Sequence, residues 1–363
     1  MKFLFLCKRH PQGRDLLSRP FGRFFYLPYQ LAQQGHDVTI LLLGYDDAAP
    51  LYCHINGINW YMESLRPLTQ SFGPLAYIKR ANMLIQTYKP DWVVGFSDTW
   101  FGILAVYFGQ KYNIKSLIDA YDNYESYIPW AKPLHWLWRS SLKNATALSA
   151  AGPHLAELMN LGRSGRPAEV IPMAADPVFL PIVDTHFRDV FGLQNDIPLI
   201  GYCGSLFKNR GVEVLFTAMA RLIAQMPNLK LIISGRQEKG LEIPASLRNS
   251  IIHIGYIADE QVPLFINAVD VLLVLNKNSN FGNYSYPIKL YEAMRCKMPV
   301  LASDVMATRW ILKDHPECLV EIGDPQHLAS RLQEALTWKR IDYTSMNDWQ
   351  ESANLLLNLL EDE

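Results

Sequence analysis

The residues that most constrain the fold are 281–304, FGNYSYPIKLYEAMRCKMPVLASD. They predict a helix that Ser285 caps and that carries Pro287 in its first turn, where the missing N–H leaves no hydrogen bond unmade. After Pro299 the chain continues as the short apolar strand VLAS. A strand that follows such a helix is typical of a doubly wound parallel sheet, and ligands bind these sheets where the strands end.

Apolar strands and amphipathic helices alternate along the whole chain, which predicts βαβ units. The strands expected in the first half are 3–7, 38–43, 91–96, 115–120, 146–150 and 170–177, and the helices are 21–34, 74–88, 99–108, 129–144 and 154–161. The strands expected in the second half are 199–204, 229–235, 251–255, 271–275, 300–303 and 318–322, and the helices are 212–225, 260–268, 287–295 and 324–338. The prediction is an α/β protein of two Rossmann-like domains whose parallel sheets face each other across a cleft.

A length of 363 residues also favours two domains. We expect residues 1–175 to form the first domain and 199–340 the second. Residues 176–198 contain prolines and no long periodic pattern, which is typical of a linker. Residues 341–363 contain a final amphipathic helix, expected from Tyr343, with a stripe of leucines.

The composition is that of a soluble globular protein, with 49% hydrophobic and 19% charged residues. A net charge of −1 gives the whole chain no attraction to nucleic acid or to anionic membranes. The five cysteines are odd in number and lack C-x-x-C spacing, which indicates free thiols in a reducing compartment. The first apolar run is too short for a signal peptide, and no run reaches the ~20 apolar residues of a membrane span. These features predict a cytoplasmic protein.

The central residues resemble the donor-sugar motif of GT-B glycosyltransferases of family four. The resemblance rests on Ser285, Pro287, Lys289 and Glu292 and on the strand that follows them. It implies that Glu292 accepts hydrogen bonds from the ribose of a nucleotide-sugar, with Ser285 and Lys289 beside it. A second glutamate often stands eight residues earlier in the family, where this chain has Tyr284; a subset that reads S-x-P-x-K-x-x-E fits better. Without the resemblance, a carboxylate inside a helix is more often simply solvated.

Two further stretches extend the resemblance over nearly the whole chain. IPMAADPVFLP, residues 171–181, is similar to the hinge signature of the family, and residues 201–219 are similar to the opening of its second domain. The resemblance implies a nucleotide-sugar as co-substrate, no other cofactor, no metal, and retention of the anomeric configuration. It also implies that the last helix crosses back to the first domain.

A phosphate site is expected after the strand 199–204. Glycines let a backbone approach a diphosphate, and Gly204 ends the strand while Gly211 opens the next helix. Lys208 and Arg210 lie between them, and Ser205 stands where the family usually has an arginine. We assign Arg210 and Lys208 to stabilise the charge that grows on the departing diphosphate. The alternative is a solvated turn with two incidental cations.

A base pocket and an acceptor side are less sharply marked. Tyr256 and Ile257 follow a strand and match the turn that flanks the nucleobase in the family, although local packing would explain a tyrosine there equally well. In the first domain, Asp122 is the best match to a family residue near the transferred sugar, and Asp119 is the second. Both could instead cap the next helix.

Basic residues crowd the loop 8–23, where one acid accompanies six basic side chains. One interpretation is that Arg14, Arg19 and Arg23 grip an anionic acceptor, such as a lipid-linked phosphate or an acidic saccharide; the other is a mobile solvated loop. The segment 130–138 holds three tryptophans beside basic residues, which suits a membrane interface but suits a domain core better.

The sequence therefore predicts a glycosyltransferase that moves a sugar from a nucleotide-sugar to a saccharide or lipid-linked acceptor in polysaccharide biosynthesis. Its catalytic residues would be Asp122, Arg210 and Lys208. Peripheral membrane contact at the inner face is a further expectation, and nucleic acid is not a partner. A nucleotide-sugar 2-epimerase of the same fold and a catalytically degenerate partner subunit are the alternatives.

Overall fold

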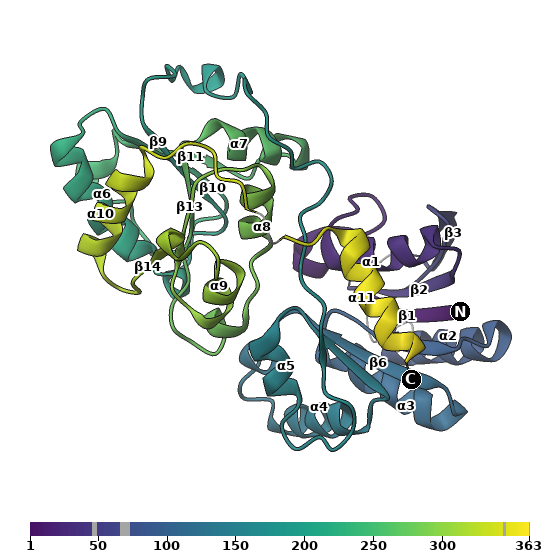
Figure 1. Ribbon diagram of the computed structural model, residues 1–363. Helices are drawn as coiled ribbons and strands as arrows, with labels where there is room; N and C mark the ends of the chain where they lie inside the picture. Colours follow the sequence, from purple (N-terminus) through teal and green to yellow (C-terminus); the bar gives the residue numbers. More distant parts are fainter. Residues whose placement is uncertain (46–48, 66–72, 344–345, 363) are drawn as a thin grey trace. The chain divides into compact units, whose positions relative to one another are not determined.

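The computed structural model describes residues 1–45, 49–65, 73–343 and 346–362. It divides into two compact units, which we treat separately (Figure 1). Unit 1 consists of Met1–Ala174 and Asn347–Glu363, and unit 2 of Ala175–Met346. Each unit holds one mainly parallel sheet with helices around it. The predicted α/β fold of two Rossmann-like domains is confirmed.

The described part of unit 1 forms a sheet of order β3-β4-β2-β1-β5-β6-β7-β8. Its strands are β1 (Lys2–Lys8), β2 (Asp37–Gly44), β3 (Leu51–Ile55), β4 (Ile58–Ser64), β5 (Trp92–Gly95), β6 (Lys115–Ala120), β7 (Ala147–Ala150) and β8 (Glu169–Val170). Its helices are α1 (Gly22–Gln33), α2 (Gly73–Tyr88), α3 (Thr99–Tyr112), α4 (Lys132–Asn144), α5 (Pro153–Met159) and α11 (Trp349–Glu361). The central strands are apolar and almost fully buried, as helices on both faces of a parallel sheet require.

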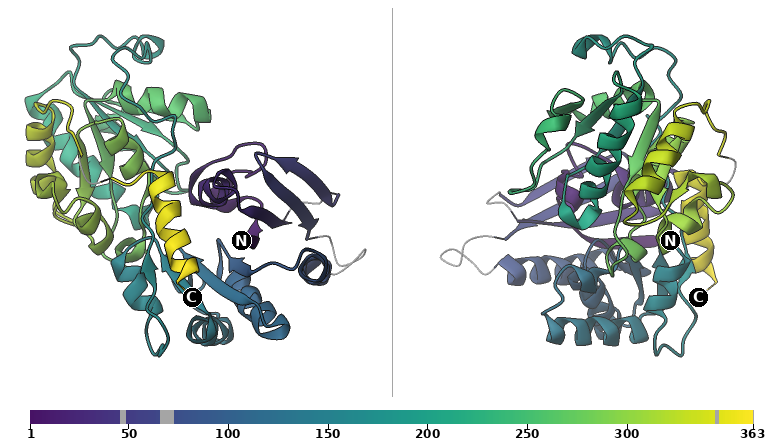
Figure 2. Two further views of the ribbon diagram at one scale, coloured as in Figure 1. Left: turned by 45° about the vertical axis from the view of Figure 1, so that its right-hand side comes forward. Right: turned by 90° about the vertical axis from the view of Figure 1, so that its left-hand side faces the viewer.

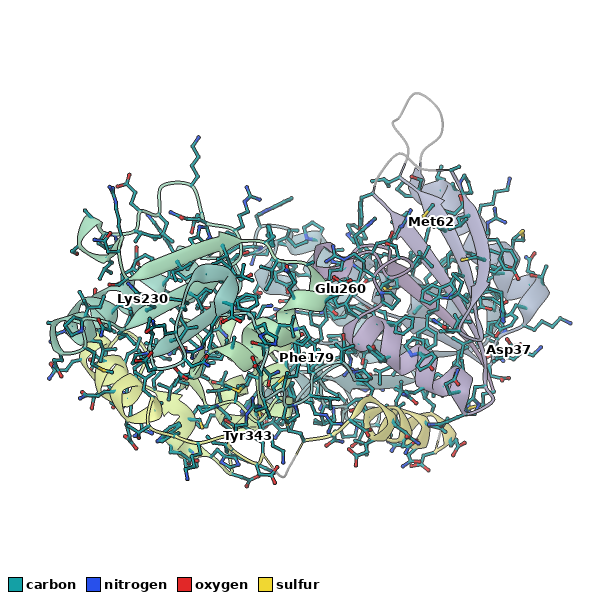
Figure 3. The ribbon with its side chains drawn as sticks, turned by 90° about the horizontal axis from the view of Figure 1, so that it is seen from above. Asp37, Met62, Phe179, Lys230, Glu260 and Tyr343 are labelled. Carbon is teal, nitrogen blue, oxygen red and sulfur yellow. The ribbon has the colours of Figure 1, made fainter. Side chains whose placement is uncertain are left out.

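The hairpin β3–β4 was not predicted. The two strands are antiparallel and are joined by Asn56 and Gly57, both with positive φ (56° and 77°). An Asn-Gly pair is the usual two-residue hairpin turn, so the signal was present in the sequence. β4 continues the sheet parallel to β2, and Figure 3 shows Met62 near the end of β4 and Asp37 at the start of β2.

Helices α3 and α4 of unit 1 each differ from prediction at one end by three or more residues. α3 passes Gly109, where a Cβ would lie 2.9 Å from the carbonyl oxygen of Ile114, and stops at Asn113 in the left-handed conformation. α4 begins at Lys132 rather than at residue 129. Of the three tryptophans in residues 130–138, Trp138 is buried and the other two are exposed, so the predicted core packing holds for Trp138 only.

The C-terminal helix α11 lies in unit 1 beside α1, as the yellow and purple helices of Figures 1 and 2 show. The rings of Tyr26 and Trp349 stack with centroids 5.8 Å apart, and the Ser352 hydroxyl donates to the carbonyl of Pro172. The helix starts six residues later than expected because Asp348 caps it. Tyr343, the expected start, instead donates a hydrogen bond to the carbonyl of Met298 in unit 2.

Unit 2 has a parallel sheet of order β11-β10-β9-β12-β13-β14. Its strands are β9 (Leu199–Cys203), β10 (Lys230–Ser234), β11 (Ile251–Gly255), β12 (Val271–Val274), β13 (Val300–Ser303) and β14 (Leu319–Val320). Its helices are α6 (Val212–Gln225), α7 (Val262–Ala268), α8 (Ile288–Arg295), α9 (Met306–Ile311, not predicted) and α10 (Pro325–Ala335). The chain reverses its direction of winding between β9 and β12, the place where such sheets bind ligands.

The segment predicted as a linker, 176–198, belongs to unit 2 in this division. Arg188 ties it down, since its guanidinium donates to the carbonyls of Ala268 and Ile197 (2.7 and 2.8 Å) and pairs with Asp270 at 3.0 Å. A segment held by one buried arginine packs on unit 2 instead of spanning open solvent.

Arg23 does not belong to an exposed basic loop. It lies in the first turns of α1, is 2% exposed, and forms a bidentate ion pair with Asp119 of β6 (2.8 and 2.5 Å). Its remaining nitrogen donates to the carbonyl of Ile171 at 2.7 Å, and Ser149 of β7 donates to Asp119 at 2.6 Å. The predicted acceptor-binding role of Arg23 is therefore wrong, because the residue is used inside the unit. Asp119 is committed to the same pair.

We expect the substitution Arg23→Met to lower the free energy of unfolding by about 3–5 kcal/mol, because it leaves the Asp119 carboxylate buried without its countercharge. Arg19→Met, on the exposed neighbouring arginine, should change it by less than about 0.5 kcal/mol. Urea unfolding followed by circular dichroism measures both. Equal midpoints for the two variants would contradict a structural role for the pair.

Candidate functional site

Two glycines end adjacent strands of unit 2. Gly204 follows β9 with φ +153°, and Gly235 follows β10 with φ +135°. A Cβ on Gly235 would lie 2.2 Å from the carbonyl oxygen of Gly204, closer than any side chain tolerates. The strand ends are therefore bare backbone, which a ligand can approach closely.

Helix α8 brings the central sequence motif to this edge. Lys289 lies in its first turn, and its ammonium nitrogen is 3.4 Å from the Cys203 sulfur at the end of β9. Its Cε would lie 3.8 Å from a Cβ on Gly204. The two motifs are more than eighty residues apart in sequence, yet the fold places them side by side.

Arg210 is held in a fixed position at the same edge. Its guanidinium donates to the Asn276 side chain at 2.5 Å and lies over the Phe281 ring, 4.5 Å from the centroid. Burial raises the pKa of the nearby Tyr202 phenol to about 12, although the Arg210 charge lowers it. Lys208 is exposed in the same turn, with its backbone N–H bound to Glu238 at 2.7 Å. Sequence reasoning missed Asn276, whose only signal is its place just after β12.

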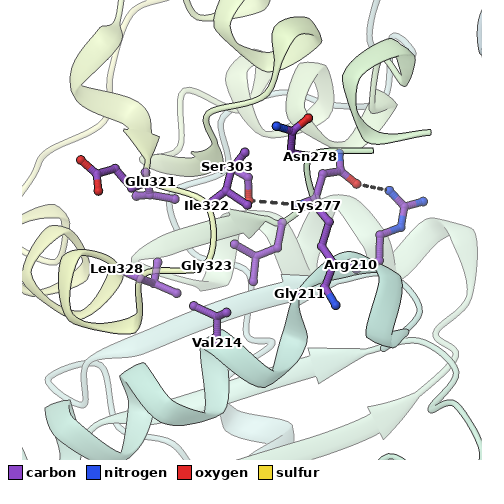
Figure 4. Close-up of a pocket in the computed structure, with 13 residues that line it drawn as sticks. Arg210, Gly211, Val214, Lys277, Asn278, Ser303, Glu321, Ile322, Gly323 and Leu328 are labelled. Atoms are coloured by element: carbon purple, nitrogen blue, oxygen red, sulfur yellow. Dashed lines mark hydrogen bonds between the residues drawn. The ribbon is translucent and has the colours of Figure 1, made fainter. Parts of the chain in front are cut away.

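A cavity of about 280 Å³ adjoins Arg210 where β12, β13 and β14 end (Figure 4). It shares only Arg210 with the predicted donor-binding residues. The lining residues are Arg210, Gly211, Val214, Leu275, Asn276, Lys277, Asn278, Ser303, Val320, Glu321, Ile322, Gly323 and Leu328. Two cations (Arg210 and Lys277), one carboxylate (Glu321), the start of α6 and several apolar side chains therefore border this space.

Ser285 is not the N-cap of α8. The helix begins at Ile288, and Pro287 takes the cap position with an extended backbone (ψ 117°) while its carbonyl accepts from Leu290 at 3.0 Å. Ser285 is buried two residues upstream. Glu292, at 1% exposure, is buried in the second turn of α8, which argues against a merely solvated carboxylate.

The end of β11 also contacts Gly235, one of the two glycines at the ends of β9 and β10. Gly235 donates its N–H to the carbonyl of Gly255 at 2.8 Å, and a ring nitrogen of His253 lies 2.8 Å from the carbonyl of Gly235. Tyr256, the next residue, is 76% exposed, so it is available to a ligand and does not pack locally. Ile257 is half-buried beside it.

Unit 1 carries a separate polar edge where β1 and β5 end. Lys8 pairs with Asp98 at 2.9 Å, and its N–H donates to the Ser97 hydroxyl at 3.1 Å. Ser97 is fully buried with φ +73°, a conformation that few residues other than glycine adopt without strain. Burial raises the pKa of Asp98, and the Lys8 charge opposes that shift.

Asp122 belongs to the same edge, after β6. It is 6% exposed and accepts a hydrogen bond from the Tyr127 hydroxyl. Burial, followed by the charges of Asp122 and Asp98, raises the pKa of Tyr121 well above its ordinary value. Sequence reasoning missed Tyr121 and Tyr127. The N-cap position of the 3-10 turn that follows is held by Asn123 and not by Asp122.

Much of the basic loop of unit 1 is paired internally. Arg9 binds Asp15 through two nitrogens (3.1 and 2.7 Å). Burial of the Asp15 carboxyl opposes its ionisation, but the hydrogen bond from Arg9 and that from the Leu17 N–H outweigh it, so the pKa of Asp15 is lowered. Arg14 lies over the Phe21 ring, 4.9 Å from its centroid. Of the three predicted acceptor residues, Arg19 is exposed, Arg14 is half-buried and Arg23 is buried.

Across residues 1–45, 49–65, 73–343 and 346–362, no three His, Cys, Asp or Glu side chains gather closely enough to hold a metal ion. No helix in this described part has the length and apolar character needed to cross a membrane.

The strand order of unit 2 recurs in the middle of the larger sheet of unit 1, and two such units in one chain are the GT-B architecture. Residues 26–174 match the family described as glycosyl transferase 4-like domain, and residues 197–337 match glycosyl transferases group 1. The chain belongs to these GT-B glycosyltransferases.

Individual relatives are distant. A D-inositol 3-phosphate glycosyltransferase of Stackebrandtia nassauensis is 26% identical over 219 residues, which is 53% of this chain and 48% of that protein. The chain spans about a third to a half of the length of the curated relatives it matches. Sucrose-phosphate synthase of Thermosynechococcus elongatus is similar in fold (TM-score 0.78, 19% identity, 100% and 99% of the two chains). So is Anabaena HepE in complex with UDP (TM-score 0.71, 15% identity, 100% and 98%).

We expect Gly235→Ala to destabilise unit 2 by about 1–3 kcal/mol more than Gly240→Ala, because the new methyl group would overlap the Gly204 carbonyl. Gly240 also has positive φ (+81°) but has open space around its Cβ position, so it controls for backbone strain alone. Thermal unfolding measures the difference. Identical melting temperatures would show that the two strand ends are not in contact.

Proposed function

We propose that this chain transfers a sugar from a nucleotide-sugar donor bound to unit 2. The observation that carries the proposal is the contact of Lys289 with Cys203 at the end of β9. This contact brings helix α8, which contains Glu292, next to Gly204. Relatives named as glycosyltransferases and a structural neighbour in complex with UDP support the same activity.

Each donor group has a counterpart in the proposed site. Glu292 would accept the ribose hydroxyls, since a carboxylate offers acceptors only. The backbones of Gly204 and Ser205 would approach the diphosphate, with Arg210 and Lys208 as its cations. The turn at residues 256–257 would flank the base beside Gly235. Ser285 and Lys289 would complete the sugar end of the donor.

The proposed catalysis depends on the charge that develops on the leaving group. Breaking the glycosidic bond leaves negative charge on the departing diphosphate, and fixed cations stabilise that charge without reorganising during the reaction. The hydrogen bond to Asn276 and the contact with Phe281 already orient Arg210 for this role. We propose that transfer needs no metal and retains the anomeric configuration.

Unit 1 would supply the acceptor side. Asp122 is proposed to lie near the transferred sugar, oriented by Tyr127. Arg14 and Arg19 remain proposed contacts for an anionic saccharide or lipid-linked acceptor of polysaccharide assembly. A lipid-linked acceptor must be met at a membrane surface, so the proposal includes peripheral membrane contact.

The decisive experiment incubates the full chain with UDP-, GDP- and ADP-sugars and measures free nucleotide and the mass of every sugar product. A transferase releases nucleotide and, with an acceptor present, yields a heavier acceptor. An epimerase leaves the mass of its product sugar unchanged, and an inactive partner subunit releases nothing. Either of the last two results overturns the proposal.

Glu292→Gln should weaken donor binding by about ten- to a hundredfold, because it removes a charge-assisted hydrogen bond worth roughly 1.5–3 kcal/mol while keeping the shape of the side chain. Isothermal calorimetry with the best nucleotide-sugar measures this. Glu334→Gln, on the exposed face of α10, is the matched control and should bind normally. Unchanged affinity in Glu292→Gln would remove this residue from the site.

Arg210→Ala should lower kcat by about a hundredfold or more but raise the donor dissociation constant by less than about tenfold, since its charge matters most in the transition state. Lys208→Ala should act in the same direction. Lys277→Ala removes a neighbouring cation that is not assigned to the donor and serves as the control. Full turnover at saturating donor in Arg210→Ala would disprove the leaving-group role.

A further inference from the structure

Helices α3 and α4 of unit 1 and the loop before α4 expose several large apolar side chains. The two helices pack together where the absent side chain of Gly102 makes room for the Trp138 ring, which a Cβ would approach to 2.6 Å. Their outward residues, together with the loop before α4, include Trp100, Tyr107, Trp130, Trp136 and Leu137, exposed by 54%, 49%, 80%, 70% and 43%. We call these five residues the α3–α4 patch.

The charges of the two helices have one sign. Their 27 residues (14 and 13) contain Lys111, Lys132, Arg139 and Lys143 but no aspartate or glutamate. Arg139 is paired with Glu125 through two bonds of 2.7 and 2.6 Å, so its charge is largely compensated. The three lysines are exposed, and Lys111 donates a hydrogen bond to the neutral Asn82 side chain at 2.9 Å, which leaves its charge uncompensated by that contact. Because the whole chain has a net charge of −1, this positive surface is local.

The combination of tryptophan and lysine indicates whether the α3–α4 patch suits a protein partner or a membrane surface. The cores of protein–protein interfaces are enriched in aromatic residues but depleted in lysine. At a membrane surface both are favourable, because tryptophan settles at the boundary of headgroups and acyl chains while lysine extends its ammonium to anionic headgroups.

We propose that the α3–α4 patch docks unit 1 onto an anionic lipid bilayer. α3 starts at Thr99, directly after Asp98, and Trp130 follows Tyr127 by three residues. The patch therefore begins at the sheet edge that carries Asp98 and Asp122. Docking presents this edge to the bilayer, where a lipid-linked acceptor enters; this last step rests on the proposed glycosyl transfer, whereas the docking itself does not.

The test uses the full chain and vesicles of phosphatidylcholine, with or without 30% phosphatidylglycerol, in a flotation assay. We expect binding to the anionic vesicles that salt weakens, together with a blue shift of tryptophan fluorescence. Lys132→Gln/Lys143→Gln should weaken binding by about fivefold for each lysine. Trp130→Ser/Trp136→Ser should weaken it by about tenfold or more.

Two control variants replace exposed apolar side chains or exposed lysines that lie outside the α3–α4 patch. Tyr52→Ser/Val190→Ser removes exposed apolar side chains outside the patch, and Lys239→Gln/Lys313→Gln removes exposed charges in unit 2. Both should bind as the unaltered protein does, and every variant should keep its melting temperature and its nucleotide release.

Three results overturn docking: no vesicle binding, equal binding to neutral and anionic vesicles, or binding that the patch variants retain. Self-association through the patch without vesicle binding also overturns it and identifies a second copy as the occupant. None of these results bears on donor binding, which is measured without lipid, so failure of the docking proposal and failure of the proposed function are distinguishable.

Discussion

Unit 1 depends on the buried ion pair of Arg23 and Asp119. A charge removed from water is tolerated only when its partner and its hydrogen bonds are complete. The pair meets this condition by joining α1, β6, the Ser149 hydroxyl of β7 and the carbonyl of Ile171. It lies within the sheet whose edge carries Asp98 and Asp122, so it fixes the scaffold from which those carboxylates project.

The edge of unit 2 is fixed by a different means. Gly204 and Gly235 allow two strand ends to approach without side chains, and Lys289 reaches the first of them from α8. Arg210 is restrained on both sides, by the Asn276 amide and the Phe281 ring. Such restraint reduces the rotamer entropy that a long side chain loses when it binds an anion.

The sequence was sufficient for the repeating elements, since their apolar periodicity is local; helix α6, for example, has the predicted bounds Val212–Gln225. The sequence was not sufficient to predict the role of a residue whose contacts are with residues far away in the chain. Arg23 belonged to a basic cluster in sequence, but its partner lies 96 residues away. The only signal for Asn276 was its place just after β12, because its role depends on β12 lying next to β9. The Asn56-Gly57 pair is a turn signal that the sequence does contain, although the hairpin was not predicted. The N-cap of α8 was predicted at Ser285, whereas Pro287 holds that position in the structure.

Helix α11 has a consequence for the order in which the molecule is made. Unit 1 is assembled from both ends of the chain, and Leu356, Leu359 and Leu360 of α11 are buried in it. Residues 175–346 must leave the ribosome before this helix exists, which takes roughly ten to thirty seconds at about 5–20 residues per second. During that interval the surface of α1 that later contacts Trp349 is uncovered. All of unit 2 has been made by the end of the interval, before α11 exists. Unit 1 therefore begins to be made before unit 2 but is completed after it, and the face of α1 that α11 covers stays open until then.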